Sequence, residues 1–367
     1  MQRLNNTDVF LRPDGTGSRI CQVRNGLIAN GAHVRISPAC PISISSDGII
    51  AALTGEDGRP PNGGGLHHLW LARVDENLNA RVLLVRSLPN GLVGRSVAVE
   101  GQRVFVGGSY HREAWLGELD LRAAAKKAPA IIFKDLPKPP QKESDGKAVN
   151  DLLLLGRRLF AIDDIMLPNI LLTYDLVGSD GRSVLAHCQE IPPHQSGEHI
   201  LHGAIGGKWL ALLSGSMGRE GSFRHLSLYH ANTGRKVVSF HFEVEDGQSL
   251  SVQTTGYMVD SPMHRVRSMR SADQLFPVGF LPVQVVAVGS LFYLLGARGE
   301  VLRLDLGGLT PTQAAAGEGS ERWISWEPTT GLTDGIVSLL VALPVCGRVV
   351  ASNVQGDVMV IGGTEAP

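Results

Sequence analysis

Short apolar runs recur along the chain, and a glycine precedes many of them at a fixed distance. Six glycines are followed, three and four residues later, by two adjacent apolar residues, as in Val104-Phe105 and Leu159-Phe160. These glycines are Gly48, Gly101, Gly156, Gly207, Gly289 and Gly347. A glycine turn that leads into a buried strand, repeated at a regular interval, is typical of a repeat architecture.

The intervals between these glycines indicate the size of the repeat. Four of the five intervals lie between 51 and 58 residues. A four-stranded blade of a β-propeller uses about 40–50 residues. In most repeats one apolar strand precedes the glycine, a second follows it, a third ends in Asp or Asn, and a fourth ends at a proline. The pattern therefore predicts an all-β protein built from four-stranded antiparallel blades.

The predicted strands can be assigned by their place in the repeat. The expected first strands are 42–45, 95–99, 150–155, 199–205, 283–288 and 338–343. The expected third strands are 69–75, 115–120, 170–175, 226–232 and 301–305. The expected fourth strands are 81–89, 130–137, 183–192 and 322–328. The second strands are almost wholly apolar, as strands that are covered on both faces should be.

One interval, from Gly207 to Gly289, is longer than a single repeat. Residues 249–268 within it are interpreted as a degenerate blade, which favours seven blades, and six blades are the alternative. The last repeat supplies three strands, and 33–38 resembles its missing fourth. We therefore expect strands from both termini to close the ring in one blade, which removes an open sheet edge. Residues 1–31 are then an N-terminal extension, and 32–367 form a single propeller domain.

Two turn motifs carry a family resemblance. Ser45-Ser46-Asp47-Gly48 resembles the SxDG turn between the first two strands of a propeller blade, and 228–234 resembles the "LDxxTG" exit from a third strand. The chain is therefore similar to β-propeller repeats of the quinoprotein, YVTN and WD40 kind over about residues 33–362. This resemblance implies a propeller fold and names no subfamily.

Composition excludes several classes of function. The net charge of −1 argues against a dedicated nucleic-acid binder, which normally carries a basic excess. No apolar run approaches the ~20 residues that span a membrane, and the N-terminal segment lacks the apolar core of a signal peptide. The four cysteines form no CxxC pair, so a structural zinc site is not expected. We expect a cytoplasmic protein that contacts neither nucleic acid nor membrane.

The predicted binding residues lie in loops at one face. Loops that join strands two and three share a face with those that join strand four to the next blade, and surface loops on a rigid scaffold commonly carry binding residues. The selected residues are His111, Arg112, Glu113, Asp163, Asp164, Arg219, Glu220 and Arg298. The alternative is that these loops are polar only because they face water.

Metal and catalytic sites are weaker hypotheses. Asp163 and Asp164 would bind a divalent cation or act as acid and base only if a bend brought both carboxylates together, since neighbouring strand residues point to opposite faces. By the same argument His199 and His202 should project to opposite sides of a strand. The motifs GxSxG, HExxH and GxxxxGK[ST] are missing. We expect no catalytic set and no cofactor, with the two aspartates as the alternative metal site.

The resulting functional hypothesis is a non-enzymatic interaction module. A rigid propeller would bind another protein or a peptide on its loop face, as a scaffold or a subunit of a complex. One alternative is a propeller enzyme, lactonase-like or a sugar-acting hydrolase, with a divalent metal in its channel. Another is a ligand-sensing subunit of a larger assembly. Fold alone does not choose among them.

Overall fold

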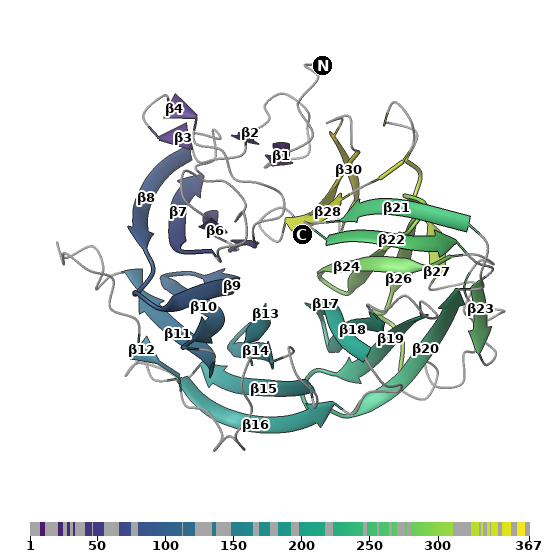
Figure 1. Cartoon of the computed structure of the whole chain (residues 1–367), viewed down its shortest axis with the longest axis horizontal. Coiled ribbons are helices and arrows are strands. Elements are labelled where there is room, and N and C mark those ends of the chain that lie inside the picture. The colour runs from purple at the N-terminus through teal and green to yellow at the C-terminus, as the bar shows by residue number, and fades with distance from the viewer. Residues whose placement is uncertain are drawn as a thin grey trace. The chain divides into compact units, whose positions relative to one another are not determined.

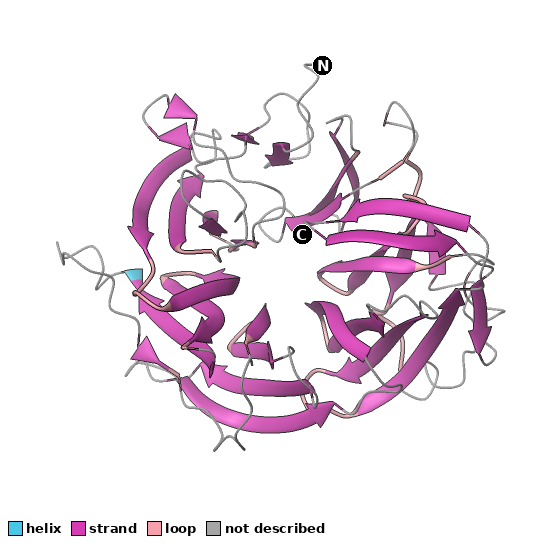
Figure 2. Cartoon of the chain, viewed as in Figure 1, coloured by secondary structure: helices cyan, strands magenta, loops and turns pink. Residues whose placement is uncertain are grey.

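The computed structural model forms two compact units. The N-terminal unit comprises Thr7–Pro192 with Pro344–Cys346, and the C-terminal unit comprises Met1–Asn6, Pro193–Leu343 and Gly347–Pro367. The structure describes residues 8–11, 21–24, 28–29, 32–33, 41–45, 47–54, 66–74, 80–111, 113–121, 134–136, 148–163, 169–176, 183–191, 198–216, 223–244, 248–254, 257–263, 266–269, 276, 280–310, 324–329, 332, 336–337, 339–343, 347–353 and 358–363. Strands make up nearly all of the regular structure in these ranges (Figure 2).

The N-terminal unit contains three four-stranded antiparallel sheets (Figure 1). The first is β5 (Ile42–Ile44), β6 (Ile49–Thr54), β7 (His68–Val74) and β8 (Ala80–Ser87). The second is β9 (Leu92–Glu100), β10 (Arg103–Tyr110), β11 (Glu113–Asp120) and β12 (Lys134–Asp135). The third is β13 (Val149–Leu155), β14 (Arg158–Asp163), β15 (Asn169–Leu176) and β16 (Ser183–Ile191). Two hairpins precede them, β1 (Asp8–Leu11) with β2 (Cys21–Arg24) and β3 (Ile28–Ala29) with β4 (Ala32–His33).

The C-terminal unit continues the pattern. Its first sheet is β17 (Glu198–Gly206), β18 (Trp209–Ser216), β19 (Phe223–His230) and β20 (Lys236–Val244), with β23 (Val266–Met269) added beside β20. Its second is β24 (Pro282–Val288), β25 (Leu291–Gly296), β26 (Val301–Asp305) and β27 (Ile324–Trp326). Its third is β28 (Leu339–Leu343), β29 (Arg348–Ser352) and β30 (Val358–Gly363). The strands β21 (Gln248–Thr254) and β22 (Tyr257–Met263) form a hairpin.

Strands that follow one another in sequence are neighbours in nearly every sheet, and all the pairs are antiparallel. Such sheets are the blades of a β-propeller, so the predicted fold class and the resemblance to propeller repeats are confirmed. The number of blades, seven or six, stays a prediction, because 248–263 form a hairpin and 266–269 extend the neighbouring sheet. Closure of the ring also stays a prediction, since 34–38 lie outside the described residues.

The six repeat glycines all adopt a backbone conformation that other residues rarely take. Their φ angles are 81°, 55°, 56°, 56°, 60° and 64° in chain order, within the left-handed region. Each lies in the turn between the first and second strands of its sheet. The turn therefore requires glycine for its backbone freedom, and the repeat that the sequence shows is a repeat of this geometry.

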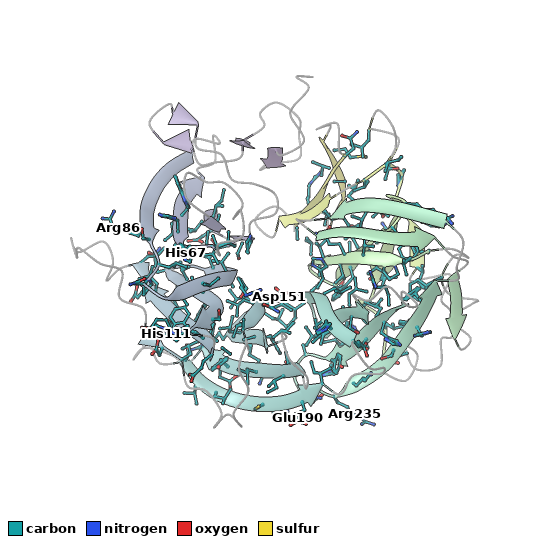
Figure 3. The ribbon with its side chains drawn as sticks, in the orientation of Figure 1. His67, Arg86, His111, Asp151, Glu190 and Arg235 are labelled. Atoms are coloured by element: carbon teal, nitrogen blue, oxygen red, sulfur yellow. The ribbon has the colours of Figure 1, made fainter. Side chains whose placement is uncertain are left out.

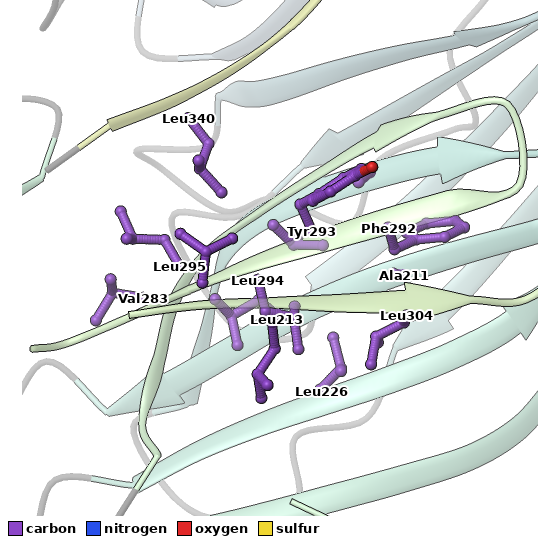
Figure 4. Packing of buried hydrophobic residues seen from close by; sticks show 14 of the residues in the cluster. Ala211, Leu213, Leu226, Val283, Phe292, Tyr293, Leu294, Leu295, Leu304 and Leu340 are labelled. Atoms are coloured by element: carbon purple, nitrogen blue, oxygen red, sulfur yellow. The ribbon is translucent and has the colours of Figure 1, made fainter. Parts of the chain in front are cut away.

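The apolar pairs that follow the glycines form the cores of the sheets. Phe105, Phe160 and Tyr293 have at most 1% of their surface exposed. In the C-terminal unit one apolar cluster joins the three sheets, with Leu213, Leu294 and Leu340 as members from each (Figure 4). Contacts of this kind make each sheet depend on its neighbour for burial.

Side chains on the first strands also join neighbouring sheets. Ser96 on β9 donates a hydrogen bond of 3.0 Å to the carbonyl oxygen of Val149 on β13. Gln284 on β24 donates to the carbonyl oxygen of Leu340 on β28 at 2.9 Å and accepts from its N–H at 3.0 Å. These bonds satisfy buried polar groups and fix the spacing of adjacent first strands.

Both turn motifs fold as predicted. The N–H of Ile49 donates to Ser45 Oγ at 2.9 Å, and the Ser45 hydroxyl also bonds Asp47. In the second motif the N–H of Gly234 donates to the carbonyl oxygen of His230 at 2.8 Å, and the φ angle of Gly234 is 65°. The strand that follows, β20, was not among the predicted fourth strands, because Lys236–Val244 does not end at a proline.

Candidate functional site

The predicted binding residues are partly covered by the structure. The side chains of His111, Glu113 and Arg298 are described and exposed. Asp163 is described as the last residue of β14, by its backbone alone. Arg112, Asp164, Arg219 and Glu220 lie outside the described residues. His111, Glu113 and Asp163 belong to the N-terminal unit and Arg298 to the C-terminal unit, so the predicted common surface stays a prediction.

The β10–β11 hairpin carries the best-defined part of this set. Tyr110 pairs with Glu113 across the hairpin, and the two-residue turn begins at His111. The φ angle of His111 is 49°, the left-handed conformation that a tight hairpin turn requires at this position. No other described residue except glycine has a positive φ. The turn thus fixes where the imidazole points.

Contacts from the loop before β9 support the imidazole. A Cβ added at Gly91 would lie 3.0 Å from His111 Cε1, and the φ angle of Gly91 is 86°. The N–H of His111 donates to the carbonyl oxygen of Gly91 at 3.5 Å. Glycine is therefore needed at 91 both for its backbone and for space, and it lets the ring lie against the loop.

Two further side chains lie beside this turn. The Tyr110 and His111 rings meet edge to face with centroids 4.2 Å apart. His67, at the start of β7, bonds through Nδ1 to the carbonyl oxygen of Leu92 at 3.1 Å, and Leu92 pairs with Tyr110. We refer to His67, Tyr110, His111 and Glu113 as the Tyr110 cluster; Figure 3 labels its two histidines. Tyr110 keeps 40% of its surface exposed, and the other three side chains are exposed as well.

A second polar group, which sequence reasoning missed, is buried in sheet β17–β20. Glu198 Oε1 accepts hydrogen bonds from Ser214 Oγ at 2.5 Å and from His225 Nδ1 at 2.9 Å. His225 Nε2 lies 2.5 Å from His241 Nδ1, so the bonds continue from the first strand to the fourth. All four side chains are buried, and Glu198 is only 1% exposed.

This arrangement differs from that of a hydrolytic triad. In a triad the base is bonded to the nucleophilic hydroxyl and takes its proton. Here the Ser214 hydroxyl donates to Glu198, and His225 bonds Glu198 and His241 instead. The bonds satisfy a buried carboxylate, which is costly to leave unpaired. The four residues therefore hold the sheet together. Three of them lie at sheet positions that become apparent only once β20 is placed.

The opposite face of the same sheet corrects a prediction about two histidines. The sequence predicted that His199 and His202 would point to opposite sides, but His199 pairs with Gly215 and His202 with Leu213. Partners two residues apart lie on one face. The cause is a register shift between Ile200 and His202, where one extra residue enters the strand. Both histidines therefore share a face with Arg224, which pairs with Gly215.

The electrostatics of that face disfavour positive charge. Burial lowers the pKa of His202 to about 4, and the nearby Arg224 guanidinium lowers it further. Burial also lowers the pKa of Arg224 to about 10, which leaves it charged at neutral pH. A neutral imidazole can bind a metal, but the neighbouring guanidinium opposes a cation there.

Sheet β9–β12 holds a third polar network. Arg103 Nε donates to Glu118 Oε1 at 2.6 Å, and its Nη2 donates to Ser183 Oγ at 2.6 Å. Ser183 in turn donates to Glu118 Oε2 at 2.9 Å, which links this sheet to β16. Both carboxylate oxygens of the buried Glu118 thus have donors. A buried ion pair with every group bonded favours one geometry over others.

The predicted metal alternative is not tested by these geometries. The side chain of Asp163 and all of Asp164 are outside what the structure describes. Within the described ranges, no three or more His, Cys, Asp or Glu side chains converge as metal ligands would. The same ranges contain no helix that is long and apolar enough to cross a membrane.

Comparison with known proteins returns likeness in fold. No family model and no curated protein matches the chain. Among solved structures, those found are WD40 and other β-propeller proteins. A protein from Lactobacillus plantarum is 15% identical, with 93% of this chain and 83% of that chain covered and a TM-score of 0.46.

Two further structures differ in what their titles report. BBS1N in complex with ARL6DN is 13% identical, with 87% of this chain and 76% of that chain covered and a TM-score of 0.42. A putative 6-phosphogluconolactonase from Bacteroides uniformis is 12% identical, with 84% and 76% covered and a TM-score of 0.42. Likeness at this level is compatible with either functional class and selects neither.

Proposed function

We propose that this protein is a non-enzymatic interaction module that binds another protein or a peptide at the loop ends of its sheets. The observation that carries the proposal is the Tyr110 cluster. It places an exposed tyrosine, two imidazoles and a carboxylate together at the end of a hairpin whose backbone is fixed on both sides.

The composition of the cluster supports binding to protein. Tyrosine is enriched at interfaces, where its ring supplies contact area and its hydroxyl a hydrogen bond. Histidine and glutamate at its border supply the polar rim that such surfaces carry. The cluster is also rigid, because the left-handed turn and Gly91 hold the His111 ring. A surface that is ordered before binding loses less conformational entropy when a partner docks.

The buried networks support the same function. Glu198, Ser214 and His225 bond one another, and Arg103, Glu118 and Ser183 do the same. Their polar groups are engaged in holding strands and sheets in place. They give the propeller the stiffness that a scaffold needs, and they leave recognition to side chains at the loop ends.

Affinity purification from cells of the source organism tests this proposal. The tagged protein should retain a partner in a stoichiometric amount over a range of salt concentrations. Tyr110→Ala should weaken that binding about tenfold, or about 1.4 kcal/mol, as expected when an aromatic anchor is truncated. Glu113→Lys should weaken it too. Arg157→Ala, at an exposed turn at the other end of its sheet, is the matched control and should bind normally.

The contrary outcomes are equally specific. A wild-type protein that stays monomeric and retains nothing at any salt concentration would contradict an interaction module. For the enzyme alternative, elemental analysis and thermal unfolding with Ca²⁺ or Mg²⁺ are the measurements. A metal that co-purifies, or a rise in Tm that Asp163→Asn removes, would favour the metal-dependent enzyme instead.

A further inference from the structure

The turn between β25 and β26 supports a second exposed surface, in the C-terminal unit. The N–H of Gly296 donates to the carbonyl oxygen of Glu300 at 2.8 Å, and the N–H of Gly299 donates to that of Gly296 at 3.0 Å. The N–H of Ala297 donates to the carbonyl oxygen of Leu281 at 2.8 Å. The turn is thus tied to itself and to the segment before β24, so side chains around it have fixed positions.

An exposed tryptophan lies on one side of this turn. Trp326 ends β27 and keeps 52% of its surface exposed. Its ring meets the buried Phe280 edge to face, with centroids 6.0 Å apart. Phe280 in turn lies beside Gly296, where an added Cβ would be 2.7 Å from its ring. The inner part of the indole is therefore anchored on the core while the rest is open to solvent.

An exposed isoleucine lies on the other side of the turn. Ile336 keeps 50% of its surface exposed, although the next residue, Val337, is only 1% exposed. A Cβ added at Gly299 would lie 2.3 Å from Ile336 Cγ2. The N–H of Val337 also donates to the carbonyl oxygen of Gly299 at 3.0 Å. Close approach to a glycine with a φ angle of 81° therefore fixes the isoleucine.

The accessible charge around these two side chains is positive. Arg298 is exposed in the turn itself, and the Arg303 side chain is 41% exposed. The acidic groups are less accessible. Glu327, with only 9% of its side chain exposed, pairs with Arg303 Nη1 at 3.2 Å. Burial raises the pKa values of Glu300 and Glu327, so neither carboxyl group strongly offsets the arginines.

The strand that carries Trp326 also has a second edge. Of the strands that the structure describes, β27 pairs with β26 alone. An extended segment can add to such an edge through its main chain while alternate side chains contact the surface. Large apolar side chains with arginine beside them are the composition of binding hot spots.

We infer that Trp326, Ile336, Arg298 and Arg303 form a docking surface for an extended acidic peptide with apolar side chains. This inference rests on the proposed function and names the chemistry of one partner segment. The apolar side chains of the peptide contact Trp326 and Ile336, and its carboxylates meet the two arginines. A basic peptide would be repelled by the same guanidinium groups, which separates the acidic class from the other extended peptides.

Peptide display against the purified full chain tests the inference without a known partner. A library of random decapeptides is selected on wild-type protein and, in parallel, on Trp326→Ala and Arg298→Glu. Val184→Ala is the matched control, because Val184 is also 50% exposed but lies on β16 in the other unit. Circular dichroism and Tm of each variant confirm that it is folded.

We expect wild type and Val184→Ala to enrich acidic peptides that contain aromatic or aliphatic residues. Synthetic copies of these peptides should bind Trp326→Ala and Arg298→Glu at least tenfold more weakly in fluorescence anisotropy, and added salt should weaken the wild-type binding. Enrichment of basic or uncharged peptides would overturn the inference. So would acidic peptides whose affinity is the same for wild type and Trp326→Ala.

The outcomes also separate this inference from the broader proposal. If enriched peptides bind Trp326→Ala normally but lose affinity for Tyr110→Ala, the docking surface assigned here is wrong and the interaction module stands. If no peptide is enriched, the docking surface is wrong, and the affinity purification decides the broader proposal. If that retains no partner either, both fail.

Discussion

At Gly156 the requirement for glycine comes from the backbone alone. Its φ angle is 56°, and a Cβ placed there would meet nothing within 4 Å. Gly101 has the same properties, with a φ angle of 55°. The repeat in the sequence is therefore a record of strained turns, and the apolar pair after each glycine reports the buried strand that the turn begins.

Gly156→Ala should lower the free energy of unfolding by about 1 kcal/mol, because a Cβ is disfavoured in the left-handed region. Gly156→Asn should cost less, since asparagine visits this region more readily. Urea unfolding measures both. Gly308→Ala is the matched control: it too has open space around it but no positive φ, and it should be neutral or slightly stabilising. Equal losses at 156 and 308 would contradict the account.

His202 should make stability depend on pH on the acidic side. Its pKa is about 4 in the fold and 6.5 unfolded. The unfolded chain therefore binds the proton first, and stability that is complete above pH 6.5 declines as the pH falls towards 4. His202→Gln removes this titration. The loss of Tm between neutral and acidic pH should be smaller in that variant than in wild type, whereas His67→Gln, at an exposed position, should behave like wild type.

Among the elements, the link from Gln284 to the backbone of Leu340 has a measurable effect. Gln284→Ala removes both partners of a buried N–H and C=O, and an unsatisfied buried group costs about 1–3 kcal/mol. The free energy of unfolding should fall by about 2 kcal/mol, and the Leu340 amide should exchange its hydrogen faster. Gln102→Ala, in the β9–β10 turn, is the control. Unchanged exchange at Leu340 would show that the link contributes nothing.

Elements that repeat could be predicted from the sequence, and those that break the repeat could not. The first, second and third strands follow from the glycine turns, and the structure places them within a few residues of the predicted ranges, as at 301–305. Lys236–Val244 was missed because it lacks the closing proline. The addition of Val266–Met269 to that strand is a long-range pairing, and no local pattern encodes it.

The candidate sites show the same division. His111, Glu113 and Arg298 could be selected as polar loop residues from the sequence alone. Their support by Gly91 or Gly296 could not, because it depends on how separate loops meet. The buried row from Glu198 to His241 runs across all four strands, so it becomes visible only after strand order and register are known. One extra residue near Ile200 was enough to reverse the predicted direction of a histidine.

For the whole molecule, stacked sheets with internally bonded polar networks supply a stiff scaffold, and the hairpin ends supply recognition. The Tyr110 cluster and the surface around Trp326 lie in different units, so they act as two sites that can be tested independently. A variant in one should leave binding at the other unchanged, because the effects of distant sites are normally additive.

Site-specific photo-crosslinking in cells of the source organism tests the central claim most directly. A photoreactive amino acid replaces His111 in one protein and Arg157 in another, the latter at a turn at the opposite end of its sheet. The account predicts a discrete crosslinked species from position 111 that contains a second protein, and none from position 157. No crosslink from 111, or the same products from both positions, would contradict it.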